Sequence, residues 1–233
     1  MTVWKDDDFM SRRAQARQRL DRFSGGAGGD WADRRRWFWH VYQSAGDDPA
    51  PVPLADLEPQ QALVEWLHDL PPERRTGRAI DVACGLGDNA EVLASAGFDV
   101  TAFDLSADAI AWAKRRFPQT QVDYRTADLF DYPESWEQAF DFVHETYTIQ
   151  ALHGELRRHA IERIARLIAR GGCLLVICRG RDEGQEFDGP PWPLSKNELA
   201  AFREYGLAEA VFDDFIEERD RSVRHFRVEY RRP

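Results

Sequence analysis

The sequence predicts an α/β fold with a mainly parallel sheet, and three observations lead to this prediction. Between residues 79 and 178, short apolar runs alternate with helical segments, which is the pattern of consecutive β-α-β units. The chain has 233 residues, enough to bury one hydrophobic core. Its 43% apolar and 31% charged residues lie near globular averages. We therefore expect one globular domain over residues 30–233.

Residues 1–29 are expected to form a flexible N-terminal segment. The stretch from Phe9 to Leu20 is polar and rich in arginine, and Ser24–Gly29 has the composition of a hinge. A helical cap should follow over residues 30–70. Aromatic and aliphatic residues recur at helical spacing in 30–43, prolines then interrupt the backbone, and a second helix is expected over 59–70.

The central part, residues 78–178, should contain the parallel strands and the helices that connect them. Strands are expected at Ala79–Ala83, Val100–Phe103, Val122–Arg125, Phe140–His144 and Leu174–Cys178. Helices are expected at Asn89–Ala96, Ala107–Arg116 and Glu155–Ala169, the last ending before Gly171 and Gly172.

Residues 179–233 change in character. A polar loop, Arg179–Gly189, precedes a helix expected at Ser195–Tyr205. Val211–Glu217 and Val223–Tyr230 then alternate apolar and polar residues, as paired antiparallel strands do.

Charge and composition exclude several classes of function. The formal charge of −10 disfavours nonspecific binding to nucleic acid or to an anionic membrane. No apolar run is long enough to span a bilayer and no signal peptide is recognisable, so we expect a soluble cytoplasmic protein. Three cysteines at spacings that suit neither a disulfide framework nor a zinc site predict no metal centre. The Arg34–Trp39 cluster fits a helix with buried aromatic residues better than a phosphate site.

The most informative stretch is a strand that runs into a glycine-containing loop and then a helix. Gly85 and Gly87 provide a tight turn along which a ligand can lie against bare backbone. Asp104 closes the next strand, 17 residues after Gly87, where a carboxylate can accept hydrogen bonds from both ribose hydroxyls. Together these residues predict a nucleoside-containing cofactor.

The acids around the glycine loop favour S-adenosylmethionine over NAD. A dinucleotide places its pyrophosphate at the helix N-terminus, and Asp88 would repel that anion. S-adenosylmethionine carries no phosphate, and carboxylates such as Asp81 and Asp88 suit its amino group. Asp88 as an ordinary acid of the first helical turn is compatible with either cofactor.

An adenine pocket is expected at the next strand ends. Asp128 can accept a hydrogen bond from the exocyclic amine, while Leu105 and Leu129 pack against the ring faces. The alternative is that Asp128 is only a turn residue.

The ordered motifs Asp81–Gly87, Asp104–Ser106 and Asp128–Leu129 resemble those of class I S-adenosylmethionine-dependent methyltransferases over about residues 60–180. The resemblance implies a Rossmann-like, doubly wound, seven-stranded sheet with an antiparallel last strand. It also implies that S-adenosylhomocysteine is the product and that no metal is needed. The cofactor-binding residues would be Asp81, Ala83, Gly85, Gly87, Asp88, Asp104, Leu105, Asp128, Leu129 and Glu145.

A narrower resemblance rests on Phe140–Tyr147 and Gly189–Leu194, with Pro59 and Trp66 upstream. These segments are similar to the thiopurine S-methyltransferase-like branch, which includes thiol, halide and tellurite methyltransferases. The resemblance implies that the Gly-Pro-Pro segment lies over the acceptor pocket and that the N-terminal helices close the cofactor site.

Acceptor-site residues are expected around the end of the fourth strand. We expect Glu145, Tyr147 and His144 to be catalytic, with His153 nearby, and Trp192, Tyr147 and Arg179 to bind the substrate. A thiol or halide attacks without a base, whereas an alcohol must lose its proton. His144 as a hydrogen-bonded structural residue and Trp192 as a core residue are the alternatives.

The sequence therefore predicts methyl transfer from S-adenosylmethionine to a small molecule, with a thiol or another soft nucleophile as acceptor. An O- or N-methyltransferase, a noncatalytic S-adenosylmethionine-binding protein and a dinucleotide reductase are the competing hypotheses. The oligomeric state is not predicted.

Overall fold

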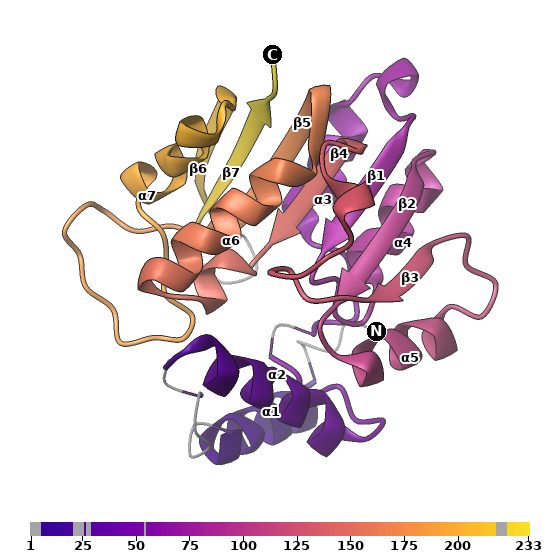
Figure 1. The fold of residues 1–233 in the computed structure, drawn as a ribbon. Helices are drawn as coiled ribbons and strands as arrows, with labels where there is room; N and C mark the ends of the chain where they lie inside the picture. Colours follow the sequence, from indigo (N-terminus) through magenta and orange to yellow (C-terminus); the bar gives the residue numbers. More distant parts are fainter. Residues whose placement is uncertain (1–5, 21–25, 27–28, 54, 218–222) are drawn as a thin grey trace.

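The computed structural model describes residues 6–20, 26, 29–53, 55–217 and 223–233. Its centre is a seven-stranded sheet in the order β3-β2-β1-β4-β5-β7-β6 (Figure 1). Strands β1 to β5 pair in parallel, and β7 is antiparallel to both β5 and β6. The bounds are β1 Arg78–Val82, β2 Asp99–Asp104, β3 Asp123–Thr126, β4 Phe140–Thr146, β5 Ile168–Arg179, β6 Ala208–Ile216 and β7 Arg224–Arg231. The predicted fold class, including the antiparallel last strand, is confirmed.

Helices cover both faces of the sheet, because the apolar residues of the buried strands face both ways. One face packs against α3 (Gln61–Asp69), α4 (Asp88–Ala96) and α5 (Ala107–Arg116). The other face packs against α6 (Gly154–Leu167), α7 (Lys196–Ala200) and the 3-10 helix η5 (Ala201–Tyr205). The described part of the chain also contains the 3-10 helices η2 (Pro72–Arg74), η3 (Glu134–Trp136) and η4 (Ile149–Ala151).

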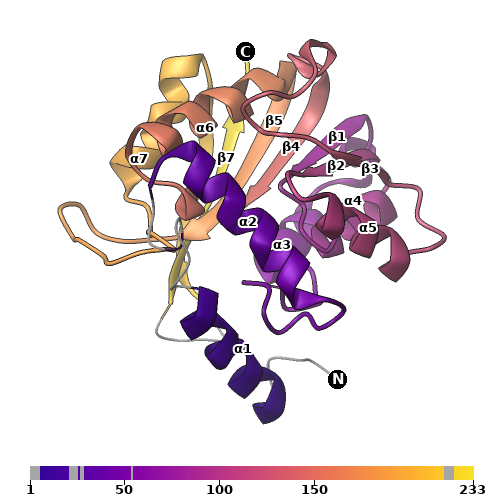
Figure 2. The ribbon, with the colours of Figure 1, turned by 60° about the horizontal axis from the view of Figure 1, so that its bottom comes forward.

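Two N-terminal helices, α1 (Asp7–Leu20) and α2 (Trp31–Ala45), form the cap, and α2 lies across the carboxyl edge of the sheet (Figures 1 and 2). Trp37 and Val41 of α2 pack with Trp112 of α5 in a third apolar cluster. The indole N–H of Trp39 donates to the carbonyl of Leu105, at the end of β2 (3.2 Å). The cap therefore contacts the sheet edge where parallel α/β folds bind ligands.

Part of the segment expected to be flexible is helical. Residues 7–20 form α1, with Phe9, Ala16 and Leu20 buried on one side. The Asp6 carboxylate accepts from the backbone N–H groups of Asp8 and Phe9, and Arg13 pairs with Asp56 (2.6 Å). Because the segment is rich in arginine, its narrow apolar stripe was not recognised in the sequence. Residues 1–5, 21–25 and 27–28 of the same segment lie outside the described residues.

Several element boundaries differ from the sequence prediction, and two of these differences change the type of structure. The helix expected to reach Ala169 ends at Leu167, because Ile168 already pairs with Phe140 of β4 across an irregular register. The single helix expected over 195–205 is a short α-helix followed by η5. No helix in the described part of the chain is both long and apolar enough to cross a membrane.

Candidate functional site

A cavity of about 1510 Å³ lies between the cap and the carboxyl edge of the sheet. The cap lines one side, and the glycine loop after β1 and the ends of β2, β4 and β5 line the other. Ala83, Gly85, Asp88, Asp104, Leu105 and Leu129 from the predicted cofactor set lie in its wall, as do Tyr147 and Arg179 from the predicted acceptor set. The structure thus brings most of the predicted site residues into one space.

The glycine loop needs its glycines for two different reasons. Gly85 and Gly87 have φ values of 54° and 91°, a region that residues with a side chain rarely adopt. A Cβ at Gly87 would also lie 2.3 Å from the hydroxyl oxygen of Tyr124. The loop therefore presents bare backbone at the N-terminus of α4, as its sequence predicts.

Asp104, at the end of β2, holds this loop in place. Its carboxylate accepts from the backbone N–H of Gly85 (3.0 Å) and from that of Ser106 (2.9 Å). Burial raises the pKa of Asp104 to about 6. Each carboxylate oxygen can accept a further hydrogen bond. Asp104 can thus hold two ribose hydroxyls from the cavity wall, which is the role expected for it.

Asp81 and Asp88 differ from their expected role. Asp81 is buried in β1, where its carboxylate contacts Nδ1 of His144 (2.7 Å), and it does not line the cavity. Asp88 lines the cavity but makes a two-pronged ion pair with Arg116 (2.6 Å for each hydrogen bond). Because Arg116 balances its charge, Asp88 would repel a pyrophosphate less than the sequence suggested. It is therefore weaker evidence against a dinucleotide cofactor.

His144 and Glu145 point away from the cavity, contrary to the catalytic contact expected of them. Both side chains are fully buried. The second ring nitrogen of His144 is hydrogen-bonded to Thr146 (2.7 Å). One oxygen of Glu145 accepts from the backbone N–H groups of Thr148 (2.6 Å) and Ile149 (3.1 Å), at the start of η4. Successive side chains of β4 point to opposite faces of the sheet, so Glu145 points into the core on the face that α6 covers.

Tyr147 does face the cavity, in a set of contacts that sequence reasoning missed. Its hydroxyl accepts from Nε2 of Gln60 and is hydrogen-bonded to Nε2 of His225, each at 2.8 Å. Tyr147 has a φ of 67°, an unfavourable value for a side chain of this size. Gln60 precedes α3 and His225 belongs to β7, so only the sheet order brings them together. No local sequence pattern could have indicated this contact.

Aromatic residues of α2 cover the predicted adenine end of the site. The indole N–H of Trp31 donates to Asp128 (3.3 Å), so this acid is already hydrogen-bonded and does not line the cavity. Tyr42 lies against Gly85, and burial raises the pKa of its hydroxyl well above the usual value. Arg34, from the arginine cluster, is buried and donates to the carbonyl of Ala151 (2.8 Å). The cluster is helical, as predicted, but within it Arg34 and Trp37 are buried whereas Trp39 is exposed.

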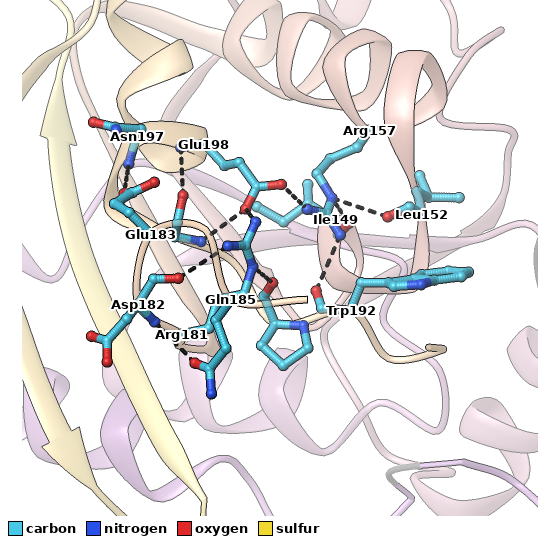
Figure 3. Close-up of polar contacts among 12 residues, drawn as sticks. Ile149, Leu152, Arg157, Arg181, Asp182, Glu183, Gln185, Trp192, Asn197 and Glu198 are labelled. Atoms are coloured by element: carbon cyan, nitrogen blue, oxygen red, sulfur yellow. Dashed lines mark hydrogen bonds and ion pairs between the residues drawn. The ribbon is translucent and has the colours of Figure 1, made fainter. Parts of the chain in front are cut away.

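The Gly-Pro-Pro segment also contributes to the cavity wall. Pro190 and Pro191 line it, and Arg17 of α1 donates to the carbonyl of Pro190 (3.0 Å). The Trp192 ring does not line the cavity and instead packs against His153, with ring centroids 5.3 Å apart. Figure 3 shows the carbonyl of Trp192 bound by Arg157 of α6. Trp192 is therefore part of the packing beneath the loop, the alternative that its sequence context allowed.

Among the described residues, no three His, Cys, Asp or Glu side chains are grouped in a way that could hold a metal ion.

Comparison with known proteins agrees with the fold and the glycine loop. Residues 79–172 match the family model described as "Methyltransferase domain". Malonyl-[acyl-carrier protein] O-methyltransferase of Enterobacter lignolyticus is 33% identical over 111 residues, which are 48% of this chain and 42% of that protein. The chain covers between 27% and 55% of the length of the six curated relatives that it matches.

Two solved structures show the same fold at low sequence identity. One, from work on the conversion of a disulfide bond into a thioacetal group during echinomycin biosynthesis, has a TM-score of 0.68 at 22% identity and covers 85% of this chain and 93% of its own. The other is 1,6-didemethyltoxoflavin-N1-methyltransferase of Burkholderia thailandensis with bound 1,6-didemethyltoxoflavin and S-adenosylhomocysteine, with a TM-score of 0.65 at 17% identity, covering 85% and 87%. Residues 79–172 are thus similar to a methyltransferase domain, and the chain has the fold of class I S-adenosylmethionine-dependent methyltransferases.

Proposed function

We propose that this chain transfers the methyl group of S-adenosylmethionine to a small-molecule acceptor. The observation that carries the proposal is one continuous cavity whose wall contains the glycine loop and Asp104 together with Tyr147 and Arg179. Bound there, the cofactor supplies a methyl group on a positively charged sulfur. The chain's contribution is to hold donor and acceptor in line and to exclude water.

The cofactor end is supported by the chemistry of the residues present. Gly85 and Gly87 provide backbone without a Cβ, Asp104 offers carboxylate oxygens, and Leu105 and Leu129 provide apolar surface. The cap covers this end through Trp31 and Tyr42. Asp128 can take part if an adenine amine shares or replaces the Trp31 hydrogen bond.

For the acceptor we propose a thiol or another soft nucleophile, on the pattern of the thiopurine S-methyltransferase-like branch. Pro190 and Pro191 lie in the cavity wall, as the likeness to that branch implies. The similar structure from echinomycin biosynthesis concerns sulfur chemistry. A soft nucleophile also fits a site in which His144 and Glu145 are turned away from the cavity.

A hydroxyl or amine acceptor is the second candidate, because one observation favours it. Tyr147 lines the cavity wall, and its hydroxyl is hydrogen-bonded to the buried His225 behind it. Such a pair can receive the proton that an alcohol or amine loses during transfer. The similar O-methyltransferase of Enterobacter lignolyticus and N-methyltransferase of Burkholderia thailandensis act on such atoms.

The test is S-adenosylhomocysteine release from S-adenosylmethionine with an aromatic thiol, hydrosulfide, iodide or catechol, each against a blank without acceptor. Turnover with a thiol or with iodide supports the soft nucleophile if Tyr147→Phe and His225→Gln change the rate by no more than a few fold. Turnover with catechol that both variants reduce about 10²- to 10⁴-fold supports the second candidate. His68→Gln, at an exposed histidine in α3, is the control and should match the wild type. Tight S-adenosylhomocysteine binding without turnover on any of the four, or on a wider panel, would contradict an enzymatic function. Tight NADP binding without S-adenosylhomocysteine binding would contradict the cofactor.

A further inference from the structure

Arg179 is the last residue of β5 and lies in the cavity wall on the acceptor side. It is the register partner of His225 in β7, and β5 also neighbours β4, which leads into Tyr147. Its backbone N–H donates to the side chain of Gln150 (2.7 Å). Its guanidinium group makes no hydrogen bond or ion pair with any described residue, and its Nε is shielded from water.

Of the other arginines in the cavity wall, two have acidic partners, whereas Arg17 and Arg34 donate to backbone carbonyls. Arg13 pairs with Asp56 (2.6 Å), and Arg227 pairs with Asp213 (2.8 Å). A shielded N–H without an acceptor is unfavourable in a folded protein, and a ligand oxygen that accepts from it removes this penalty. Arg179 is therefore placed and left available as an anion-binding group, in a protein with a net charge of −10.

We propose that the methyl acceptor carries a carboxylate group, which Arg179 binds. This proposal rests on the proposed function and names the class of acceptor. The planar guanidinium matches a carboxylate through two parallel hydrogen bonds. A phosphate dianion fits less well, because Asp213, Asp214 and Glu217 line the same cavity and add negative potential.

The position of Arg179 also orients the acceptor. Neighbouring strands lie about 5 Å apart, so the ends of β4 and β5 can be reached by a single small molecule. With its carboxylate on Arg179, the rest of the acceptor extends toward Tyr147 and the glycine loop. The anionic end and the reacting atom are thereby held at separate points, which fixes the approach to the methyl group.

The test compares matched acids and amides on protein loaded with S-adenosylhomocysteine. Calorimetric titrations use 4-mercaptobenzoate against 4-mercaptobenzamide and 4-hydroxybenzoate against 4-hydroxybenzamide, so the readout is independent of the nucleophile and of turnover. The wild type should bind each acid at least about tenfold more tightly than its amide. Arg179→Gln should bring this ratio close to one. Arg179→Lys, which keeps the charge without the planar fork, should retain part of the preference.

The control is Arg203→Gln, at an exposed arginine on η5 that pairs with Glu209 outside the cavity. It should keep the wild-type ratio, and all variants should bind S-adenosylhomocysteine as the wild type does. An acid preference that is absent in the wild type, or unchanged in Arg179→Gln, overturns the inference. Phenyl phosphate binding more tightly than the acids overturns the choice of carboxylate. If the wild type fails to bind S-adenosylhomocysteine, the result contradicts the proposed function instead. Titration of the same acids and amides into protein without S-adenosylhomocysteine then tests the role of Arg179 by itself.

Discussion

Glu145 is a buried carboxylate with a structural task. It holds two backbone N–H groups of the turn into η4, while its other oxygen, Oε2, has no hydrogen-bond partner among the described residues. Burial raises its pKa from 4.5 to about 7. The folded state therefore retains a proton that the unfolded state releases, so this group makes stability fall as pH rises from about 4.5 to about 7.

Glu145→Gln should remove this pH dependence. The amide oxygen can still accept from Thr148 and Ile149, and the buried charge is lost. We expect the variant to be more stable than the wild type at pH 8 by about 2–3 kcal/mol and close to it at pH 4.5. Urea denaturation followed by circular dichroism at both pH values measures this difference. Glu204→Gln, at an exposed glutamate, should follow the wild type. Equal pH slopes for Glu145→Gln and the wild type would contradict the assignment.

Gly87→Ala tests the cofactor loop at a single atom. The new Cβ would lie 2.3 Å from the Tyr124 hydroxyl oxygen, and the alanine would have to adopt the φ of 91° that the glycine has, which is unfavourable for a residue with a side chain. We expect a loss of stability of about 1–3 kcal/mol and at least tenfold weaker S-adenosylhomocysteine binding, measured by calorimetry. Gly184→Ala shares the positive φ but has no atom within 4 Å of its Cβ and lies outside the cavity, so its S-adenosylhomocysteine affinity should equal that of the wild type.

Among the elements, the loop between β5 and α7 is held by a buried arginine of α6. Arg157 contacts the carbonyls of Ile149, Leu152 and Trp192 and pairs with Glu198, which also binds Arg181 of the loop (Figure 3). These contacts link the turn after Tyr147 to the segment that contains Pro190 and Pro191. The part of the cavity wall that contains Tyr147, Pro190 and Pro191 is thus held in place by contacts outside the cavity.

Arg157→Met should destabilise the protein by about 1–3 kcal/mol, because it leaves the carbonyls of Ile149, Leu152 and Trp192 without their donor. It should also speed proteolysis between residues 181 and 196. Chemical denaturation and mass spectrometry of the first cleavage products check both effects. The neighbouring Arg158→Met removes only an exposed pair with Glu204 and should cost less than about 1 kcal/mol. Similar stability losses in the two variants would show that the network does not hold the loop.

Local patterns predicted the elements but not the contacts between distant ones. The helix at 107–116 matches its predicted bounds, because its Ser106 cap and apolar spacing are local signals. The glycine loop with Gly85 and Gly87, and Asp104 after it, were also predictable, since a strand, a turn and an acid follow one another at fixed spacing. His225 and Gln60 were missed, because they reach Tyr147 only through strand order and α3 packing. The sequence did not indicate that His144 and Glu145 are buried and do not line the cavity, because the direction of their side chains depends on the pleat of β4 and on the buried Asp81.

For the whole molecule, the cofactor should act as a link between cap and sheet. A ligand that binds only the folded state at 100 times its Kd adds about 2.7 kcal/mol of stability. For a domain of this size we expect a rise in Tm of roughly 5–10 °C with saturating S-adenosylhomocysteine. Differential scanning calorimetry measures the shift, and NADP at the same concentration is the control. A Tm that is unchanged by S-adenosylhomocysteine would contradict the cofactor site.

The strand order also sets the sequence of events during synthesis. β7, residues 224–231, lies between β5 and β6 rather than at an edge, and it carries His225. The glycine loop and its acids, all before residue 130, emerge from the ribosome about a hundred residues earlier. A nascent chain can therefore complete the glycine loop and strands β1 to β3 while β7, which pairs with β5 beside Arg179, is still missing. A shortened chain that stops before residue 224 would keep the glycine loop and Asp104 and lose a strand that supports the cavity wall.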